Sequence, residues 1–276
     1  MSGGIFFITH PNYMQLKNIL SETIQCVYSV AAFIQAEANK ISGSDVEIKS
    51  LNSLVTYVDK TAEALLVKEL ANILPESVFL TEENTIEQKS GVYRWIIDPL
   101  DGTTNFIHQV PVYAISIALQ KNEEIILGVV YELNRNEMFT AIKGAGAFLN
   151  DIPIGVKNNL LLSDALIATG FPYYDFQQLD NYVRTLRFLM ENTRGIRRLG
   201  SAAVDLCYTA CGRFDAFFEY SLSPWDVAAG GLILQEAGGM VKDFSGGDNW
   251  LFGKEIAGGN ATILTDILNI INNSHS

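Results

Sequence analysis

The sequence predicts a layered α/β (α+β) sandwich, in which mixed sheets and helix pairs form an α-β-α-β-α arrangement. Three observations lead to this fold class. Two segments with helical periodicity come first. A series of apolar segments divided by short polar turns follows, as in an antiparallel meander, and strands alternate with helices after about residue 150. The change of pattern near residue 150 predicts two subdomains, 1–150 and 151–276, within one structural unit.

The first half is predicted to contain two helices followed by strands. Apolar residues at helical spacing predict a long amphipathic helix over 12–41. A second helix is predicted over 58–74, because its periodicity stops before Pro75. The segment 42–49 is expected to be a loop or an edge strand, and 84–91 a polar loop. The expected strands are 78–80, 92–97, 112–120, 125–131 and 137–141, with a further short strand within 144–150.

The second half is predicted to alternate strands and helices after a loop-like stretch over 151–163. The expected strands are 165–169, 196–199, 214–219, 240–243 and 255–258. The expected helices are 176–192, one opened by 200–203 that runs to about Ala210, 225–237, and 261–272. The glycine pair Gly238-Gly239 is a normal stop for the third of these helices.

The charge balance of the 276-residue chain excludes one class of partner. The formal net charge is −12, whereas nonspecific nucleic-acid binding needs clustered Lys and Arg. We therefore expect no nucleic-acid partner. An acidic protein that binds an anionic phosphate must recruit cations, so the charge agrees with a metal site.

Cysteine usage and hydropathy predict a cytoplasmic protein without a membrane segment. The three cysteines are too few for a disulfide framework, which fits a reducing compartment; they are Cys26, Cys207 and Cys211. No apolar run approaches the ~20 residues that span a bilayer. Residues 1–11 are apolar but lack a basic start, so we do not expect a signal peptide.

The most informative stretch is 95–106, which reads Trp-Ile-Ile-Asp-Pro-Leu-Asp-Gly-Thr-Thr-Asn-Phe. Asp98 and Asp101 follow an apolar run, and carboxylates at this spacing can face one point across a tight turn. Gly102, Thr103 and Thr104 then offer backbone N–H groups where a helix could begin. These residues predict a hard cation with oxygen ligands beside a phosphate. The alternative is an ordinary turn before a helix start, and the residues alone leave both interpretations open.

Further carboxylates stand at the ends of predicted elements. Asp59 and Asp226 lie at helix starts, Glu82 and Glu83 follow a strand, and Ser201 opens a helix. Each is by itself consistent with a structural role, because an acidic residue at a helix N-terminus contributes ~0.5–2 kcal/mol. Their spacing does not show that they meet in space.

Three separated blocks connect these residues to a known family. They are 55–59 together with 80–83, 95–106, and 223–230 followed by 236–239. With these blocks in this order, the chain resembles the inositol monophosphatase family of magnesium-dependent, lithium-sensitive phosphatases. The resemblance covers almost the whole chain after about residue 12, and the block 95–106 closely matches the family signature.

The resemblance implies a metal centre with two or three Mg²⁺ ions per subunit. One ion would be bound by Glu82, Asp98 and the backbone carbonyl of Leu100. A second would be bound by Asp98, Asp101 and Asp226, with Asp98 bridging the two ions. Asp59 would serve a weaker third site through water. Carboxylates select hard Mg²⁺ over softer metals, and two ions about 4 Å apart can activate water and stabilise the leaving oxygen.

The resemblance also implies catalytic and substrate-binding roles. Thr103, hydrogen-bonded near Glu82, would orient the nucleophilic water and help to deprotonate it. The implied phosphate and substrate contacts are the N–H groups of Gly102 and Thr103, with Thr104 beside them, the backbone at Ala202, and Glu219 at the substrate hydroxyls. Asp59 and Glu82 would act with Thr103 in catalysis.

The expected function is that of a Mg²⁺-dependent phosphomonoesterase. It would hydrolyse a small polyol phosphate such as inositol 1-phosphate with metal-activated water, as a homodimer. Alternatives with the same chemistry are a 3′(2′),5′-bisphosphate nucleotidase, a fructose-1,6-bisphosphatase or a histidinol-phosphatase. A further alternative is a non-catalytic regulatory binding protein, since some family members bind the transcription machinery. It is less favoured because every carboxylate that the resemblance implies is present.

Some positions depart from the family pattern or lack an assigned role. Lys49 resembles a family lysine, but the loop before Asp59 is one residue shorter here. Arg197 and Arg198 could serve an interface or a phosphate. The aromatic segment 171–180 could shape substrate choice, form a dimer contact or only pack.

Overall fold

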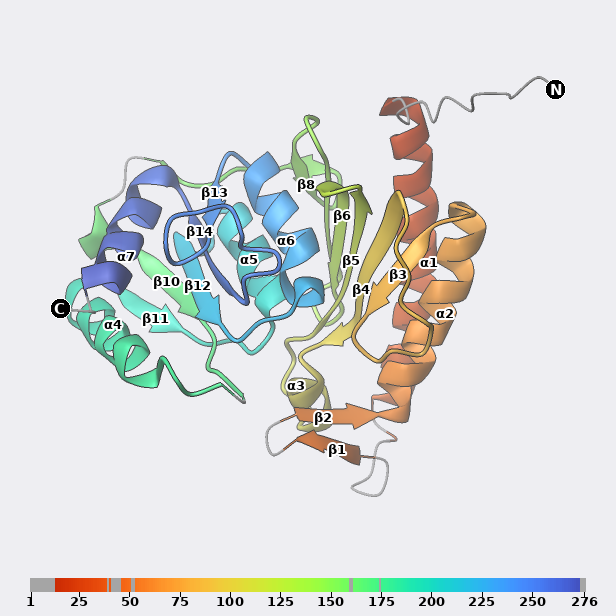
Figure 1. Cartoon of the computed structure of the whole chain (residues 1–276), viewed down its shortest axis with the longest axis horizontal. Coiled ribbons are helices and arrows are strands. Elements are labelled where there is room, and N and C mark those ends of the chain that lie inside the picture. Colours follow the sequence, from red (N-terminus) through yellow and green to blue (C-terminus); the bar gives the residue numbers. More distant parts are fainter. Residues whose placement is uncertain are drawn as a thin grey trace.

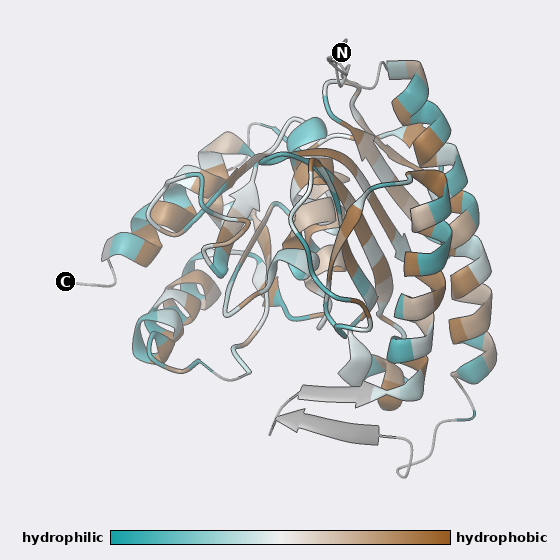
Figure 2. Ribbon diagram, turned by 45° about the vertical axis from the view of Figure 1, so that its right-hand side comes forward, coloured by the Kyte–Doolittle hydropathy of each residue, from teal (hydrophilic) through white to brown (hydrophobic). Residues whose placement is uncertain are grey.

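The fold is a stack of five layers, α-β-α-β-α, as the sequence predicted (Figure 1). The computed structural model describes residues 13–38, 40, 46–50, 53–158, 161–173 and 175–273. The expectation for residues 1–11 and the role of the Lys49 side chain lie outside this description. Apolar residues concentrate in the central strands, and the outer helices turn polar faces outward (Figure 2).

The first sheet has seven strands and is almost entirely antiparallel. Its strands are β3 (Val78–Thr81), β4 (Tyr93–Asp101), β5 (Ala114–Lys121), β6 (Glu124–Glu132), β7 (Glu137–Ile142), β8 (Ala147–Leu149) and β9 (Ile152–Pro153), in that order across the sheet. Only the β3–β4 pair is parallel among the described strands of this sheet. The remaining strands therefore form the meander that the short polar turns predicted.

Two long helices, α1 (Tyr13–Glu37) and α2 (Tyr57–Ile73), cover the outer face of this sheet. Alternate residues of β4, Trp95 and Ile97, point into this layer, as expected for a strand buried on both faces. By length and composition α1 could cross a membrane, which the sequence reading did not single out. One face of α1, including Val27 and Ile34, is buried against the core, which is typical of a core helix.

The middle layer consists of α5 (Ala202–Ala210) and α6 (Pro224–Glu236). Both helices are almost fully buried, because one core cluster packs on them from both sheets. Gly128 of β6 permits close packing here, since a Cβ at that position would lie 2.9 Å from the carbonyl oxygen of Ala229. The middle helices thus join the two halves of the chain.

The second sheet has five strands in the order β11-β10-β12-β14-β13. Their bounds are β10 (Leu166–Thr169), β11 (Gly195–Arg197), β12 (Ala216–Tyr220), β13 (Met240–Lys242) and β14 (Glu255–Gly259). The helices α4 (Leu179–Asn192) and α7 (Ala261–Asn273) cover its outer face. This sheet is mixed, since β10 pairs in parallel with both neighbours and β14 pairs antiparallel with both of its own.

The structure differs from the sequence-based expectations at the end of β4, and it specifies the pairing of the strand before α2. The strand 92–97 was expected to end before Asp98, whereas β4 continues to Asp101 through a β-bulge. The segment 42–49 was expected as a loop or an edge strand, and β1 (Val46–Ser50) pairs with β2 (Ser53–Thr56) as a separate two-stranded sheet. A five-residue helix, α3 (Thr103–Ile107), follows β4 directly.

Candidate metal centre and substrate pocket

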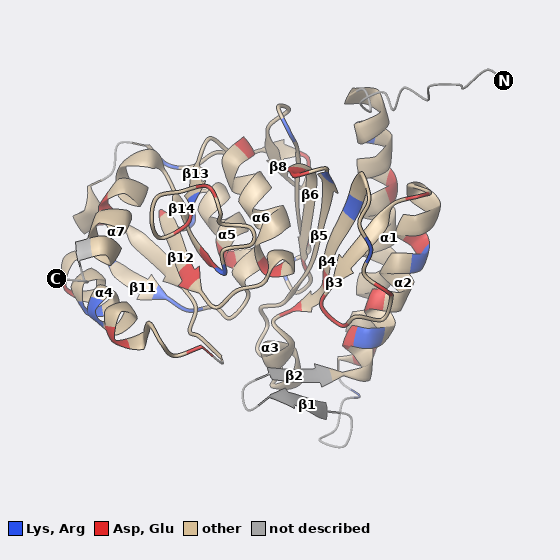
Figure 3. Ribbon diagram, in the orientation of Figure 1, with Lys and Arg blue, Asp and Glu red and all other residues tan. Residues whose placement is uncertain are grey.

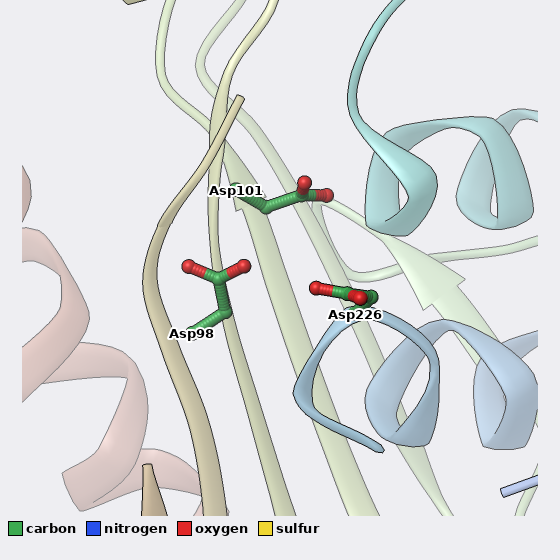
Figure 4. A group of neighbouring side chains, drawn as sticks. All are labelled: Asp98, Asp101 and Asp226. Carbon is green, nitrogen blue, oxygen red and sulfur yellow. The ribbon is translucent and has the colours of Figure 1, made fainter. Parts of the chain in front are cut away.

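The carboxylates of Asp98, Asp101 and Asp226 converge at one point between the two sheets (Figure 4). Each offers an oxygen atom, and these atoms lie within 4.8 Å of one another. Asp98 and Asp101 come from the end of β4, and Asp226 comes from the first turn of α6. In a regular strand, residues three apart point to opposite faces. The bulge between Asp98 and Asp101 removes this alternation and brings both carboxylates to the same side.

Each of the three carboxylates is anchored through one of its oxygens. Asp98 Oδ1 accepts from the backbone N–H of Leu100 at 2.9 Å. Asp226 Oδ2 accepts from the backbone N–H of Ser223 at 2.7 Å, the capping contact of α6. Asp101 Oδ2 accepts from the Ser201 hydroxyl at 2.7 Å and from a second donor at the start of α5, the backbone N–H of Ala203, at 2.8 Å. The anchoring fixes the orientation of the groups before any ligand binds.

The electrostatics of the cluster favour a bound cation. Burial raises the pKa of Asp98 well above its usual range, and the charges of Glu82, Asp101 and Asp226 raise it further. Burial likewise raises the pKa of Asp226, and it raises that of Asp101 to about 6. Like charges held this close ionise together only when a cation compensates them. Clustered hard carboxylate oxygens suit Mg²⁺, so the residues present fit the metal that the sequence predicted.

Thr103 is connected to Asp59, whereas the sequence interpretation placed its hydrogen bond near Glu82. The Thr103 hydroxyl donates to Asp59 Oδ1 at 2.8 Å, with the carbonyl oxygen of Leu100 as a second acceptor at 3.1 Å. Asp59 Oδ2 in turn accepts from the N–H of Thr56 at 2.8 Å and from its hydroxyl at 2.6 Å. This capping box at the start of α2 holds a fully buried carboxylate behind Thr103.

A cavity of about 370 Å³ opens over this candidate metal-binding cluster. Of the residues that the sequence singled out, the cavity is lined by Glu82, Asp98, Leu100, Asp101, Gly102, Thr103, Thr104, Arg198, Ser201, Ala202, Glu219 and Asp226. Asp59 does not line the cavity and reaches it through Thr103. A volume of this size is suited to a small metabolite. The structure therefore brings the predicted residues from four distant segments to one pocket.

Glu82 is placed by a buried carboxylate that the sequence analysis did not identify. Glu63 of α2 accepts from the backbone N–H groups of Glu83 and Thr85, both at 2.7 Å, and from the Thr85 hydroxyl at 2.7 Å. Its side chain is fully buried. The loop that carries Glu82 is thus tied to α2, although the sequence showed only a polar loop there.

The far end of the cavity contains Glu219 of β12 and Arg198, one of the two arginines whose placement the sequence left open. Burial raises the pKa of Glu219 to about 8, and the charge of Arg198 counteracts part of this rise. Gly170 leaves the space that the Glu219 carboxyl occupies, because a Cβ at position 170 would lie 2.0 Å from it. The structure separates the two arginines, since Arg198 lines the cavity and Arg197 is exposed. Figure 3 shows acidic residues of both sheets around this region and basic residues at the end of β11.

Comparisons with known proteins agree with this arrangement. The profile described as the inositol monophosphatase family matches residues 14–275. A protein of Neisseria meningitidis serogroup B named "Putative Nus factor SuhB" is 44% identical over 235 residues, which cover 85% of this chain and 90% of that protein. The "Inositol-1-monophosphatase" of Mesorhizobium japonicum is 37% identical over 259 residues, covering 94% and 97%.

A solved structure gives the same result for the fold. The crystal structure of the extragenic suppressor protein suhB from Bartonella henselae superimposes with a TM-score of 0.86 at 37% identity, covering 92% of this chain and 98% of that chain. The matching profile spans both sheets and every residue of the acidic cluster. The chain belongs to the inositol monophosphatase family.

Proposed function

We propose that the protein is a Mg²⁺-dependent phosphomonoesterase that hydrolyses a small polyol phosphate such as inositol 1-phosphate. The observation that carries this proposal is the convergence of Asp98, Asp101 and Asp226 beside a cavity of about 370 Å³. The family is metal-dependent and acts on phosphorylated metabolites, and one relative is named inositol-1-monophosphatase.

The proposed ligand set follows the pocket. Glu82, Asp98 and the Leu100 carbonyl would hold one Mg²⁺, and Asp98, Asp101 and Asp226 a second, with a weaker third near Asp59. Bound there, Mg²⁺ would supply Lewis-acid activation of water and charge compensation for the leaving oxygen. The N–H groups of Gly102 and Thr103, next to Thr104, would hold the phosphate, because the first N–H groups of a helix have no partner within it.

The protein's own residues would orient the attacking water and receive its proton. Since the Thr103 hydroxyl donates to Asp59, its oxygen is left to accept a hydrogen bond from a water molecule. A neutral threonine hydroxyl is too weak a base to take this proton unless it gives up its own. The proton of the water would therefore pass to Thr103 Oγ1 as the Thr103 proton passes to Asp59 Oδ1. Thr56 fixes the position of Asp59 for this transfer.

The experiment is phosphate release from a panel of phosphomonoesters, with Mg²⁺ and then with EDTA. Inositol 1-phosphate, a nucleoside 3′,5′-bisphosphate, fructose 1,6-bisphosphate and histidinol phosphate distinguish the alternatives that share the chemistry. Mg²⁺-dependent release that is fastest with inositol 1-phosphate supports the proposal. Preference for another ester replaces the substrate and keeps the mechanism, and no release from folded protein removes the proposal.

A second candidate is a regulatory binding role, which the name of the Neisseria relative favours. We propose that this role does not depend on turnover. A pull-down of transcription complexes with wild type and with Asp101→Asn tests it. Equal capture by both forms supports a separate binding function, whereas no capture by either form removes it. We further propose that the protein is cytoplasmic and forms a homodimer. Sedimentation at several protein concentrations would test the dimer, and cell fractionation would test the location.

A further inference from the structure

Among the described residues that line the cavity, Arg198 is the one cation. The same wall carries five carboxylates, which are those of Glu82, Asp98, Asp101, Glu219 and Asp226. Four of these lie in or near the metal-binding cluster, and Glu219 lies apart from them on the second sheet. The function proposed above assigns no role to Arg198, although a charged side chain in a substrate cavity affects which ligand binds.

The guanidinium of Arg198 is held on several sides. Nη2 donates to the Tyr173 hydroxyl at 2.6 Å, and Cζ lies 5.6 Å from the ring centroid of Phe171 and 5.8 Å from that of Tyr173. Nη1 lies only 2.6 Å from where a Cβ on Gly200 would be, so residue 200 must lack a side chain for this placement. Gly200 has φ +94°, which glycine adopts readily. The arginine is therefore fixed beside the segment that opens α5.

Arg198 retains hydrogen-bonding capacity that the protein does not use. Its Nε is buried and has no hydrogen-bond partner within the described part of the chain. Because the Arg198 side chain lines the cavity, a ligand acceptor there can reach guanidinium N–H groups other than the one that Tyr173 accepts. The guanidinium can present several N–H groups from a fixed plane, unlike an ammonium group.

The charge around Arg198 determines which ligand group fits. The positive charge of Arg198 opposes the burial that raises the pKa of Glu219 and of Asp205, a fully buried residue of α5. Two buried carboxyl groups thus lie within electrostatic reach of the one cation, and the ionised form of either group opposes a second phosphate at this end of the cavity. A neutral group with neighbouring hydroxyls is suited to both side chains, because a hydroxyl donates to a carboxylate and accepts from a guanidinium.

We propose that Arg198 is a specificity-determining residue that donates to a hydroxyl oxygen of the substrate while Glu219 accepts from a neighbouring hydroxyl. This proposal rests on the proposed phosphatase function and narrows its substrate class to monophosphates of neutral polyols. It implies that sugar bisphosphates bind less well, because their second phosphate would lie beside Glu219.

The test compares Arg198→Met with the matched control Arg197→Met, which removes the neighbouring exposed charge. The kcat/KM is measured for inositol 1-phosphate, for fructose 1,6-bisphosphate and for phenyl phosphate, which has no hydroxyls. Because hydrogen bonds to a charged group contribute strongly, we expect R198M to lose about 10- to 100-fold with inositol 1-phosphate and less than about 3-fold with phenyl phosphate. Arg198→Lys keeps the positive charge but loses the planar guanidinium. Its kcat/KM for inositol 1-phosphate should therefore fall less than that of R198M.

Three outcomes would overturn the proposal. Equal losses with inositol 1-phosphate and phenyl phosphate would mean that Arg198 supports the metal centre or the fold. An unchanged kcat/KM would mean that Arg198 does not touch the substrate. The largest loss with fructose 1,6-bisphosphate would mean that it binds a second phosphate. Calorimetry of inositol 1-phosphate binding tests the Arg198 contact independently of the phosphatase function. Weaker binding to R198M than to wild type supports the contact even if the wild type releases no phosphate.

Discussion

Replacing Gly170 by alanine should displace Glu219 while leaving the fold intact. Gly170 follows β10, and a Cβ there would lie 2.0 Å from Cδ and Oε1 of Glu219 and 2.1 Å from Oε2. Since non-bonded carbon atoms pack at about 3.5 Å, the carboxyl must move by about 1.5 Å. The φ of Gly170 is not positive, so alanine fits the backbone at this position.

The displacement affects activity and stability differently. The group that must move is the end of a flexible side chain, so we expect the melting temperature to change by less than about 4 °C, the equivalent of ~1 kcal/mol for a chain of this size. A misplacement of about 1 Å can reduce a rate ~100-fold. We therefore expect the kcat/KM of Gly170→Ala for inositol 1-phosphate to fall by about 10- to 100-fold, and that for phenyl phosphate to change little.

The assay is phosphate release at saturating Mg²⁺ together with thermal unfolding. Gly155→Ala is a matched control, because position 155 is exposed and its Cβ would meet only the Ala237 carbonyl oxygen, at 3.5 Å. A Gly170→Ala enzyme with wild-type kcat/KM for inositol 1-phosphate would refute the assignment of Glu219 to substrate binding. Equal losses with both esters would show that the displaced carboxyl disturbs the metal centre.

Three further predictions concern the acidic groups. Asp101→Asn should preserve the fold, because an asparagine keeps an oxygen that accepts from Ser201. It removes the negative charge of a proposed metal ligand, so kcat should fall more than ~10-fold, and retention of over a tenth of wild-type kcat contradicts the assignment. Glu63→Gln weakens the hydrogen bonds that hold the loop carrying Glu82. The Mg²⁺ concentration for half-maximal activity should therefore rise about tenfold, while the KM for the ester stays constant. An unchanged Mg²⁺ dependence would contradict this. Burial raises the pKa of Asp101 to about 6 and that of Glu219 to about 8, so the metal-free folded state binds more protons than the unfolded state between pH ~4 and ~8. Its stability should fall as the pH rises through this window, and the Mg²⁺-induced rise in melting temperature should be larger at pH 8 than at pH 5.5; an equal rise at both would contradict this.

The layered fold could be predicted because its elements have strong local patterns. The helical periodicity of α2 and α4 and the polar turns between β5, β6 and β7 are visible in short windows of sequence. The bulge in β4 was not predicted, because it is defined by the register against β5, in which Asp98 faces Ser116 and Asp101 faces Ala114. Register depends on the partner strand, which a local pattern does not contain.

The composition of the pocket was predicted only where the family resemblance assigned a role to a residue. Asp98, Asp101 and Thr103 stand in one contiguous block, which the family resemblance interprets. Gly170 and Arg198 had no such signal, because their roles depend on contacts with residues distant in sequence, such as Glu219. No local pattern distinguishes Arg198, which lines the pocket, from Arg197, which ends β11 outside it, because the predicted strand 196–199 contains both.

The structural and the functional interpretations of the aspartates turn out to be compatible. Asp59 and Asp226 each use Oδ2 to cap a helix, and Asp101 uses Oδ2 to accept from donors at the start of α5. The second oxygen of each remains for another task, and in Asp59 it accepts the Thr103 hydrogen bond. Capping therefore fixes the carboxylate that the site presents. An asparagine preserves one acceptor oxygen and removes the charge, whereas an alanine removes the cap as well. Comparing the two substitutions at one position would thus separate the loss of helix stability from the loss of metal binding.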